Sequence, residues 1–346
     1  MHQVNQMGFS CHLVSLIEKL YSNQEATIRW NGLHCKPFDI KKGVRQGCIL
    51  SPHLFNLYTE QVMRDSDIDG MGIKIGGRNI TNLRYADDTA LLADNITSMR
   101  RILHRVDSAG RNFGLNLNAK KTKIMHIGGE TTETEIKIDN VQLEQVKDFK
   151  YLGSIKSNDG SSTKDVKTRI GMAKRKMTTL NNIWKDKNIP IQLKLNILKS
   201  LIWPVAIYGS EAWTLKKQDV NRLNAAEMWF YRRILRISWT EKRTNESVIK
   251  ELGIQMELVK EINKRKLRYV GHATRHSKTN LMASVLQGKT EGKRKRGRPS
   301  VSYLSNLRDI TNMDVGLMTG NTRDRDKWRK IVNSVAATIG PGDADE

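Results

Sequence analysis

Apolar side chains recur at helical spacing in the first part of the chain. The pattern i, i+3, i+4, i+7 over residues 13–20 predicts an amphipathic helix, and the same period predicts another over residues 96–113. Ser51 followed by Pro52 predicts the start of a further helix, because serine caps helices and proline suits their first turn. The residues expected to face inward are Leu13, Leu16, Ile17, Leu20, Met99, Ile102, Leu103 and Val106.

Shorter apolar runs between these helices predict strands. Residues 26–30 and 36–40 flank Asn31-Gly32 and predict a hairpin, since this dipeptide tolerates the positive φ of tight turns. Further strands are expected over residues 73–75, 79–86, 89–93, 123–127, 136–138 and 149–155. Strands interleaved with helices indicate an α+β fold for the first half of the chain.

The strand signals stop beyond Ser161. Apolar residues there recur at helical spacing, so the second half is expected to be mainly helical. The expected helices cover residues 164–184, 190–208, 218–237, 244–252 and 257–269. Residues 288–299 are rich in glycine, lysine and arginine without an apolar period, which indicates a linker.

The charge of the chain is strongly positive and unevenly distributed. The 346 residues hold 59 Lys and Arg against 36 Asp and Glu, a formal net charge of +23. Residues 1–160 hold 21 basic and 18 acidic side chains, hence +3, and residues 161–346 carry the remaining +20. This balance argues against a protein that serves as an acidic ligand or mimics nucleic acid. It favours a polyanionic partner such as nucleic acid.

Cysteine usage and hydropathy indicate an intracellular protein. The three cysteines, Cys11, Cys35 and Cys48, lack the spacing of a zinc knuckle or a disulfide framework. The longest apolar run, residues 201–208, is interrupted by Pro204 and is too short to span a bilayer. Neither secretion nor membrane insertion is therefore expected.

Two adjacent carboxylates lie between two apolar strands within residues 83–93. Asp87 and Asp88 are expected on the turn of a hairpin, where hard oxygen ligands on a rigid sheet suit Mg²⁺ and leave its other positions for phosphates. The alternative is an ordinary aspartate-rich turn, because aspartate is a common turn residue.

The run GVRQGCILSPHLFNL, residues 43–57, precedes the string LRYADD, residues 83–88, by one expected helix. This pair of sequence motifs resembles the palm of reverse transcriptases, and its residues look most like those of the RTE-type branch of non-LTR retrotransposons. Further strings match in the same order: 114–118 with 121–123, 149–153, 208–213 and 232–235. The resemblance covers the chain from about Gly8 to the basic linker.

The resemblance implies a partial reverse-transcriptase palm followed by a mainly α-helical thumb and C-terminal region. The expected regions are a partial palm over 1–127, primer-grip strands over 128–160, a helical thumb-like region over 161–240, and a basic helical C-terminal region over 241–340 with the linker 288–299. The chain is thus expected to be a C-terminal portion of an endonuclease-reverse transcriptase.

The implied activity is RNA-directed DNA polymerisation by two-metal nucleotidyl transfer, with Mg²⁺ or Mn²⁺ as cofactor. Partners would be an RNA template, a DNA primer or target, and deoxynucleoside triphosphates in the full-length parent. By resemblance, Asp87 and Asp88 are catalytic metal ligands, and Gln46, Gly47 and Lys121 lie at the template and nucleotide. For Lys121, an ordinary solvated lysine is the alternative. The primer grip would comprise Tyr151, Leu152 and Gly153.

One family feature has no counterpart here. The third catalytic carboxylate of the family lies on a strand upstream of the helix near Met7-Gly8, and residues 2–6 hold no acid. Asp39 is not expected to replace it, because metal sites tolerate little displacement of a ligand. We therefore expect a truncated or degenerate polymerase that is inactive alone. The alternative is a non-catalytic nucleic-acid-binding remnant of a retroelement.

The basic half offers two expected contacts with phosphates. One is a helix with Lys174, Arg175 and Lys176, whose alternative is a solvated basic face. The other is the run Lys293, Arg294, Lys295, Arg296 and Arg298, expected to combine phosphate contact with nuclear import. The alternative is an insert into the DNA minor groove, because Arg-Gly-Arg-Pro resembles an AT-hook core, but the proline usual before the first arginine is missing. The neighbouring tryptophans are expected to pack in the core rather than stack on bases. They are Trp203, Trp213, Trp229 and Trp239.

Overall fold

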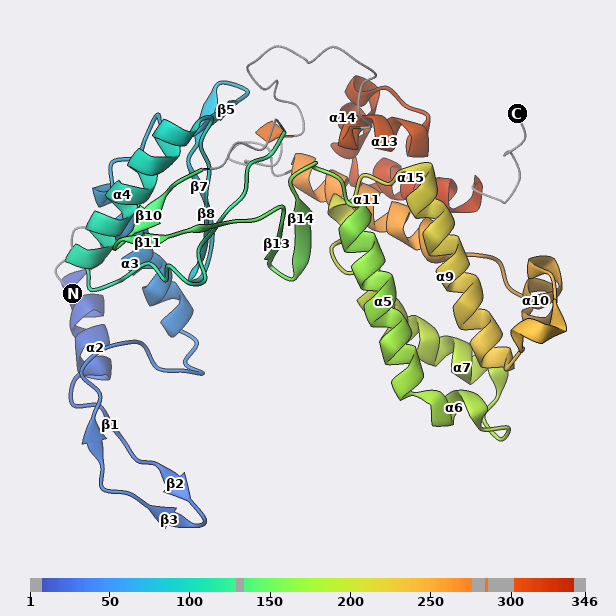
Figure 1. The fold of residues 1–346 in the computed structure, drawn as a ribbon, viewed down its shortest axis with the longest axis horizontal. Coiled ribbons are helices and arrows are strands. Elements are labelled where there is room, and N and C mark those ends of the chain that lie inside the picture. The colour runs from blue at the N-terminus through green and yellow to red at the C-terminus, as the bar shows by residue number, and fades with distance from the viewer. Residues whose placement is uncertain (1–7, 129–133, 276–283, 286–301, 339–346) are drawn as a thin grey trace. The chain divides into compact units, whose positions relative to one another are not determined.

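The computed structural model describes residues 8–128, 134–275, 284–285 and 302–338 (Figure 1). The chain forms two compact units. Unit 1 comprises residues 1–122 and 134–142, and unit 2 comprises residues 123–133 and 143–346. The expected linker 288–299, with Lys293, Arg294, Lys295, Arg296 and Arg298, lies outside the described residues.

Unit 1 contains the expected helices. They are α2 (Cys11–Tyr21), α3 (Ser51–Asp65) and α4 (Ile96–Asn112). The inward stripe predicted for α2 is largely wrong: Val14 and Ile17 are buried, whereas Leu13, Leu16 and Leu20 are exposed. These leucines lie on a face that the described elements of unit 1 do not cover. The prediction for α4 is confirmed at Ile102, Leu103 and Val106, which are buried.

The strands of unit 1 form separate antiparallel pairs. They are β1 (Glu25–Ala26) with β4 (Phe38–Asp39), β2 (Arg29–Trp30) with β3 (Leu33–His34), β5 (Ile73–Ile75) with β6 (Arg78–Ile80), β7 (Asn82–Tyr85) with β8 (Asp88–Leu91), and β10 (Lys137–Ile138) with β11 (Val141–Gln142). The hairpin at Asn31-Gly32 is confirmed, and both residues have positive φ, 48° and 82°. The single strand expected over 79–86 is divided into β6 and β7. Strand β6 pairs with β5 across a turn at Gly76-Gly77, whereas β7 pairs with β8.

Unit 2 begins with short strands. They are β9 (Lys123–Ile124), parallel to β12 (Glu144–Gln145), and β13 (Asp148–Tyr151), antiparallel to β14 (Ser154–Ser157). The single strand expected over 149–155 is therefore a hairpin. Its two-residue turn consists of Leu152 and Gly153, with φ of 48° and 80°.

The helical prediction for the second half is confirmed. Unit 2 contains α5 (Thr163–Thr179), α6 (Asn181–Lys185), α7 (Ile191–Ile197), a π-helical turn (Leu198–Ile202), α8 (Trp203–Ala206), a 3₁₀ turn (Ser210–Ala212), α9 (Lys217–Leu235), a 3₁₀ turn (Trp239–Glu241), α10 (Asn245–Leu252), α11 (Leu258–Arg275), α13 (Tyr303–Thr311), α14 (Val315–Thr322) and α15 (Arg325–Thr338). None of the helices among the described residues is long and apolar enough to cross a membrane.

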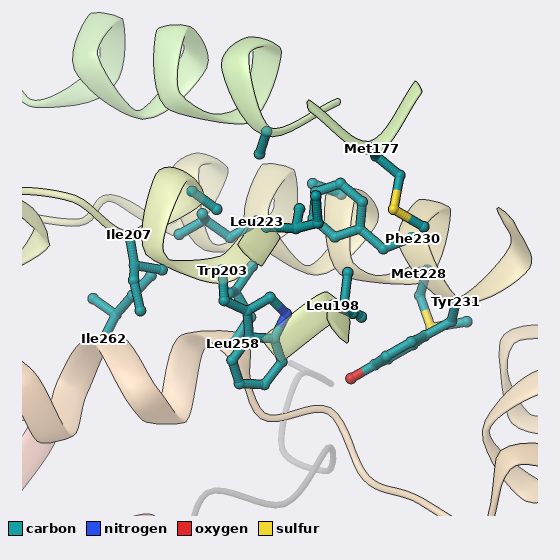
Figure 2. Close-up of a cluster of buried hydrophobic side chains, with 14 of the residues drawn as sticks. Met177, Leu198, Trp203, Ile207, Leu223, Met228, Phe230, Tyr231, Leu258 and Ile262 are labelled. Carbon is teal, nitrogen blue, oxygen red and sulfur yellow. The ribbon is translucent and has the colours of Figure 1, made fainter. Parts of the chain in front are cut away.

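The main core of unit 2 lies where α5 and α9 pack against the segment 191–207 and the start of α11. Figure 2 shows Met177 of α5 and Phe230 of α9 pointing into this cluster, with Trp203 and Leu258. The expectation of buried tryptophans is confirmed for Trp203 and Trp213, and Trp229 is partly buried. It is wrong for Trp239, which is 87% exposed because it lies on the connection between α9 and α10.

Candidate active site and nucleic-acid interface

The acidic hairpin has the form predicted from the sequence. Strands β7 and β8 pair in the register Tyr85 opposite Asp88, and Ala86, with φ of 52°, forms the turn with Asp87. Asp87 and Asp88 are both exposed. Within the described part of the chain, neither carboxylate has a side-chain hydrogen bond or ion pair, so both keep their oxygens free for a ligand.

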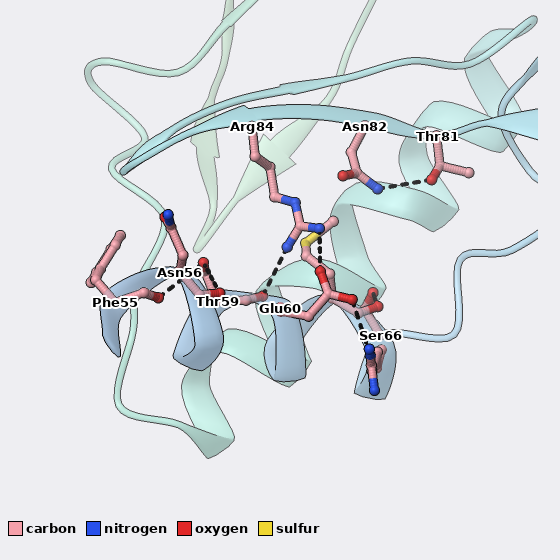
Figure 3. A network of polar contacts seen from close by, with 10 residues as sticks. Phe55, Asn56, Thr59, Glu60, Ser66, Thr81, Asn82 and Arg84 are labelled. Carbon is pink, nitrogen blue, oxygen red and sulfur yellow. Dashed lines mark hydrogen bonds and ion pairs between the residues drawn. The ribbon is translucent and has the colours of Figure 1, made fainter. Parts of the chain in front are cut away.

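Arg84 fixes this hairpin to helix α3. Its guanidinium contacts the Glu60 carboxylate at 2.5 Å and donates to the Thr59 carbonyl at 3.3 Å (Figure 3). The Arg84 guanidinium, together with Arg64, holds the pKa of Glu60 below its usual range, so the pair is ionised at neutral pH. Strand and helix are joined by a charge-assisted contact that holds the turn in place.

The orientation of β7 directs the turn toward the beginning of α3. In Figure 3, Arg84 lies over Glu60, whereas Thr81 lies toward the Ser66 end of the helix. The chain after Arg84 therefore continues toward the Phe55 end. Phe55 is about one helical turn from Ser51, where α3 emerges from the glycine-bounded loop.

The glycine-bounded loop, residues 43–50, is held by α2. Arg45 donates to the Leu20 carbonyl at 2.9 Å and lies over the Tyr21 ring at 5.8 Å. The Ser51 hydroxyl donates to the Arg45 carbonyl at 2.6 Å and also contacts the Tyr21 hydroxyl. The sequence predicts that Ser51 is the N-cap of α3. It is instead the first residue of the helix, where its side chain binds the loop, and the N-cap position is occupied by Leu50.

Gln46 and Gly47 lie on the surface of this loop. Gly47 has a φ of 82°, and a Cβ built there would meet no atom within 4 Å. The glycine is therefore required by the backbone conformation, and the space beside it is open in this chain. Gln46 is exposed, and no hydrogen bond joins it to Asp87 or Asp88 among the residues that the structure describes.

The acidic hairpin partly fits a divalent cation. Asp87 and Asp88 supply adjacent, exposed carboxylates without competing partners, which is the donor chemistry that Mg²⁺ prefers. Over the described residues, however, no group of three His, Cys, Asp or Glu side chains is placed to hold a metal. The hairpin alone thus offers two of the ligands of such a site.

Lys121 lies in a turn after α4 and is exposed. Its backbone N–H donates to Asn118, at 3.0 Å to the carbonyl and 3.1 Å to the side-chain oxygen. In the described residues its ammonium group has no carboxylate partner, so it is available for an anion.

In unit 2, the turn of the β13–β14 hairpin is held by two side chains from the helical region. Tyr208 donates its hydroxyl to the Leu152 carbonyl at 3.1 Å, and Arg169 of α5 contacts the Gly153 carbonyl. The Arg169 guanidinium also stacks over the Tyr208 ring at 4.3 Å. Tyr151 and Gly153 are half-buried, whereas Leu152 is 41% exposed at the tip.

Asp165 connects the same hairpin to the segment 208–213. This buried carboxylate accepts hydrogen bonds from the Ser154 hydroxyl at 2.8 Å, the Ile155 N–H at 3.0 Å and the Trp213 indole at 2.8 Å. The sequence strings 149–153 and 208–213 thus meet in space. Sequence reasoning missed Arg169 and Asp165, although charged residues on the buried face of an amphipathic helix signal such a role.

Helix α5 presents the expected basic side chains. Arg175 and Lys176 are exposed, while Lys174 is half-buried and lies over the Trp229 ring at 5.2 Å. The opposite face is apolar and buried at Val166, Ala173 and Met177. Arg175 and Lys176 are accordingly available to phosphates, whereas part of Lys174 stabilises the packing of α5 on α9.

A family model matches the first part of the chain. Residues 2–155 match the family described as reverse transcriptase (RNA-dependent DNA polymerase). This segment contains the glycine-bounded loop, the acidic hairpin and the hairpin of β13 and β14.

Several known proteins are similar to the chain. An uncharacterized transposon-derived protein of Caenorhabditis elegans is 24% identical over 75% of this chain and 98% of its own length. The Pol polyprotein of the type-1 retrotransposable element R2 of Popillia japonica is 33% identical over 38% of the chain. An RNA-directed DNA polymerase from transposon X-element of Drosophila melanogaster is 22% identical over 78%. The chain covers only 20% of the R2 protein and 30% of the X-element protein.

Proposed function

We propose that this chain is the palm and thumb portion of an RNA-directed DNA polymerase of a non-LTR retrotransposon, because residues 2–155 match the reverse transcriptase family and similar proteins come from the R2 and X-element retroelements. The observation that carries the proposal is the exposed pair Asp87 and Asp88, on a turn that Arg84 fixes to α3. The substrates would be an RNA template, a DNA primer and deoxynucleoside triphosphates.

The proposed roles extend the family resemblance to the individual side chains. Asp87 and Asp88 would hold Mg²⁺ or Mn²⁺, which when bound neutralises charge on the attacking and leaving oxygens of nucleotidyl transfer. Gln46 and Gly47 would face the templating base and the nucleotide, and Lys121 would meet phosphate charge. Unit 1 would thereby orient the nucleotide.

The primer would be contacted by unit 2. Tyr151 ends β13, and Leu152 and Gly153 form the turn that follows; Tyr208 and Arg169 hold the carbonyls of this turn, so it has a fixed shape. Arg175 and Lys176 on α5 would bind backbone phosphates. The run Lys293 to Arg298 would add phosphate contacts and nuclear import, which a fluorescent fusion with and without this run would test.

We also propose that these 346 residues bind nucleic acid without extending a primer on their own. The supporting observation is that Asp87 and Asp88 have no third metal-ligating side chain nearby in the described residues. Two carboxylates leave the cations under-coordinated against a highly charged triphosphate. Nucleic-acid binding needs only the basic surface, since residues 161–346 carry a net charge of +20.

The test combines binding and primer extension with the purified chain. We expect it to bind a poly(rA)–oligo(dT) duplex, with affinity that falls steeply with salt, and to leave the primer unextended in Mg²⁺ and dTTP. Extension that Asp87→Asn abolishes would overturn the proposed inactivity and support the role of Asp87. Absence of binding at low salt would overturn the nucleic-acid-binding proposal.

A further inference from the structure

The connection between α9 and α10, residues 236–244, carries one strongly exposed aromatic side chain. Trp239 is 87% exposed, and within the described residues its indole has no hydrogen-bond partner. Indole burial is strongly favourable, and Trp203 and Trp213 of the same unit are buried. Trp239 is therefore an exception among the tryptophans of unit 2.

The connection has a fixed backbone rather than a loose one. Arg236, in the left-handed conformation with a φ of 59°, ends α9, and the Ile237 N–H returns to the Arg232 carbonyl at 3.0 Å. Ile237 packs against the main core of unit 2. At the other end, Thr244 caps α10 by accepting from the Ser247 N–H at 3.2 Å.

Trp239 begins a 3₁₀ turn that is capped at its own start. The Ser238 N–H donates to the Glu241 carboxylate at 2.6 Å, and the Thr240 hydroxyl donates to the Ser238 hydroxyl at 2.8 Å. Arg232 spans the base of the connection by donating to the Arg243 carbonyl at 3.0 Å and the Asn245 side chain at 2.9 Å. The ring therefore projects from a preorganised support, which reduces the entropy lost on binding.

Cationic side chains surround this ring in the sequence and lack acidic partners. Within the described residues, Arg233, Arg236 and Lys242 form no ion pair with a carboxylate, whereas Arg243 pairs with Glu251 at 2.5 Å. The one acid of the connection, Glu241, is engaged by the Ser238 N–H. An exposed aromatic ring with unneutralised cations on both sides suits a ligand that combines a flat ring with anionic groups.

We propose that Trp239 stacks on an unpaired base of single-stranded RNA, with Arg236 and Lys242 on the adjoining phosphates. A base in a duplex already has both faces covered by its neighbours, so an unpaired base is the form whose face is available. This inference rests on the proposed nucleic-acid binding and assigns a stacking contact to it. The sequence pattern predicts a buried Trp239. That prediction is wrong because the exposure of this side chain depends on where α9 ends, which the pattern does not specify.

The experiment compares labelled oligo(rA) with an abasic ribose-phosphate strand of the same length, which keeps the phosphates and lacks the bases. The full chain should bind oligo(rA) more tightly than the abasic strand. We expect Trp239→Ala to weaken binding to oligo(rA) about tenfold and leave binding to the abasic strand unchanged. Trp239→Phe should retain part of the preference, since it keeps an aromatic face.

Salt dependence separates stacking from phosphate contact. Trp239→Ala should leave the slope of log K against log salt unchanged, whereas Arg236→Ala should reduce its magnitude by about one. Trp30→Ala is the matched control, because Trp30 is 76% exposed on the β2–β3 hairpin of unit 1. This control should alter neither the affinity nor the slope.

Two results would overturn the inference while leaving the proposed function intact. One is an unchanged affinity of Trp239→Ala for oligo(rA), and the other is an equal loss for the base-containing and abasic strands. A wild-type chain that binds neither strand at low salt would instead remove the proposed nucleic-acid binding itself. Unchanged circular dichroism and melting of Trp239→Ala would show that the variant is folded.

Discussion

Gly153 occupies a position that no other residue fits without strain. Its φ of 80° lies in the left-handed region, and a Cβ there would lie 3.3 Å from the Tyr208 ring. A left-handed conformation costs an L-residue about 1–2 kcal/mol, and the tight contact adds to that. We expect Gly153→Ala to lower the free energy of unfolding of unit 2 by about 2 kcal/mol, as measured by urea unfolding followed by tryptophan fluorescence.

Gly160 provides the matched control for this substitution. It has a φ of 69°, but a Cβ there would meet no atom within 4 Å. Gly160→Ala should therefore lower the stability by only about 1 kcal/mol, from backbone strain alone. Equal losses for both variants would contradict a specific fit between Gly153 and Tyr208.

Individual residues differ in how far the sequence predicts them. The turn at Asp87 could be foreseen, because turn residues between two short apolar runs are a local signal. The partners of Arg169 could not, since its contacts with Gly153 and Tyr208 join residues far apart in the sequence. The catalytic, metal-binding and primer-grip roles stay predictions.

At the scale of elements, one buried lysine joins α11 to α13. Lys266 is fully buried; its ammonium group contacts the Asn306 side chain and lies over the Tyr303 ring at 5.1 Å. Burial lowers the pKa of Lys266 to about 8, from an ordinary value of 10.5. The folded protein therefore pays a desolvation penalty whenever this lysine is charged.

The sign of the pH dependence follows from this lowered pKa. Below pH 8 both folded and unfolded Lys266 carry the proton, so the penalty is complete; between pH 8 and 10.5 only the unfolded chain retains it. The contribution of Lys266 to stability hence rises over that window, by up to about 3 kcal/mol. The measurement is urea unfolding of unit 2 at several pH values.

Lys266→Met should remove this rise and stabilise unit 2 at pH 7 by about 1–2 kcal/mol, because methionine fills similar space without a charge. Lys264→Met, on the more exposed side of α11, should leave the rise unchanged. Persistence of the full rise in Lys266→Met would show that another group titrates in this window.

The positions of helices were predictable, whereas their interruptions were not. The helix expected over 190–208 contains a π-helical turn at Leu198–Ile202, just before Pro204. Proline lacks the N–H that would bond to the carbonyl four residues earlier, so the backbone widens there. The hairpin within 149–155 was missed because Leu152, which adopts a positive φ, is not a turn residue by type.

The two units differ in how completely they bury apolar side chains. Among the described residues, the main cluster of unit 2 contains 21 buried side chains, including Trp184, Leu198 and Phe230. The cluster around α4 in unit 1 contains three, Ile68, Ile102 and Val106. Since a buried large apolar side chain contributes roughly 2 kcal/mol, unit 2 has much the larger hydrophobic stabilisation.

Unit 1 should therefore unfold at a lower urea concentration than unit 2. Six of the seven tryptophans lie in unit 2, so tryptophan fluorescence reports mainly on its unfolding, and hydrogen exchange of α4 amides reports on unit 1. We expect α4 to lose protection before the fluorescence transition. Ile102→Ala, which truncates a fully buried side chain, should lower the free energy of unfolding of unit 1 by about 3 kcal/mol and shift only the α4 transition to lower urea. Phe230→Ala should lower the free energy of unfolding of unit 2 by about 3 kcal/mol and shift only the fluorescence transition. Coincident transitions in both variants would instead mean that the units unfold together and that stability is shared across the whole chain.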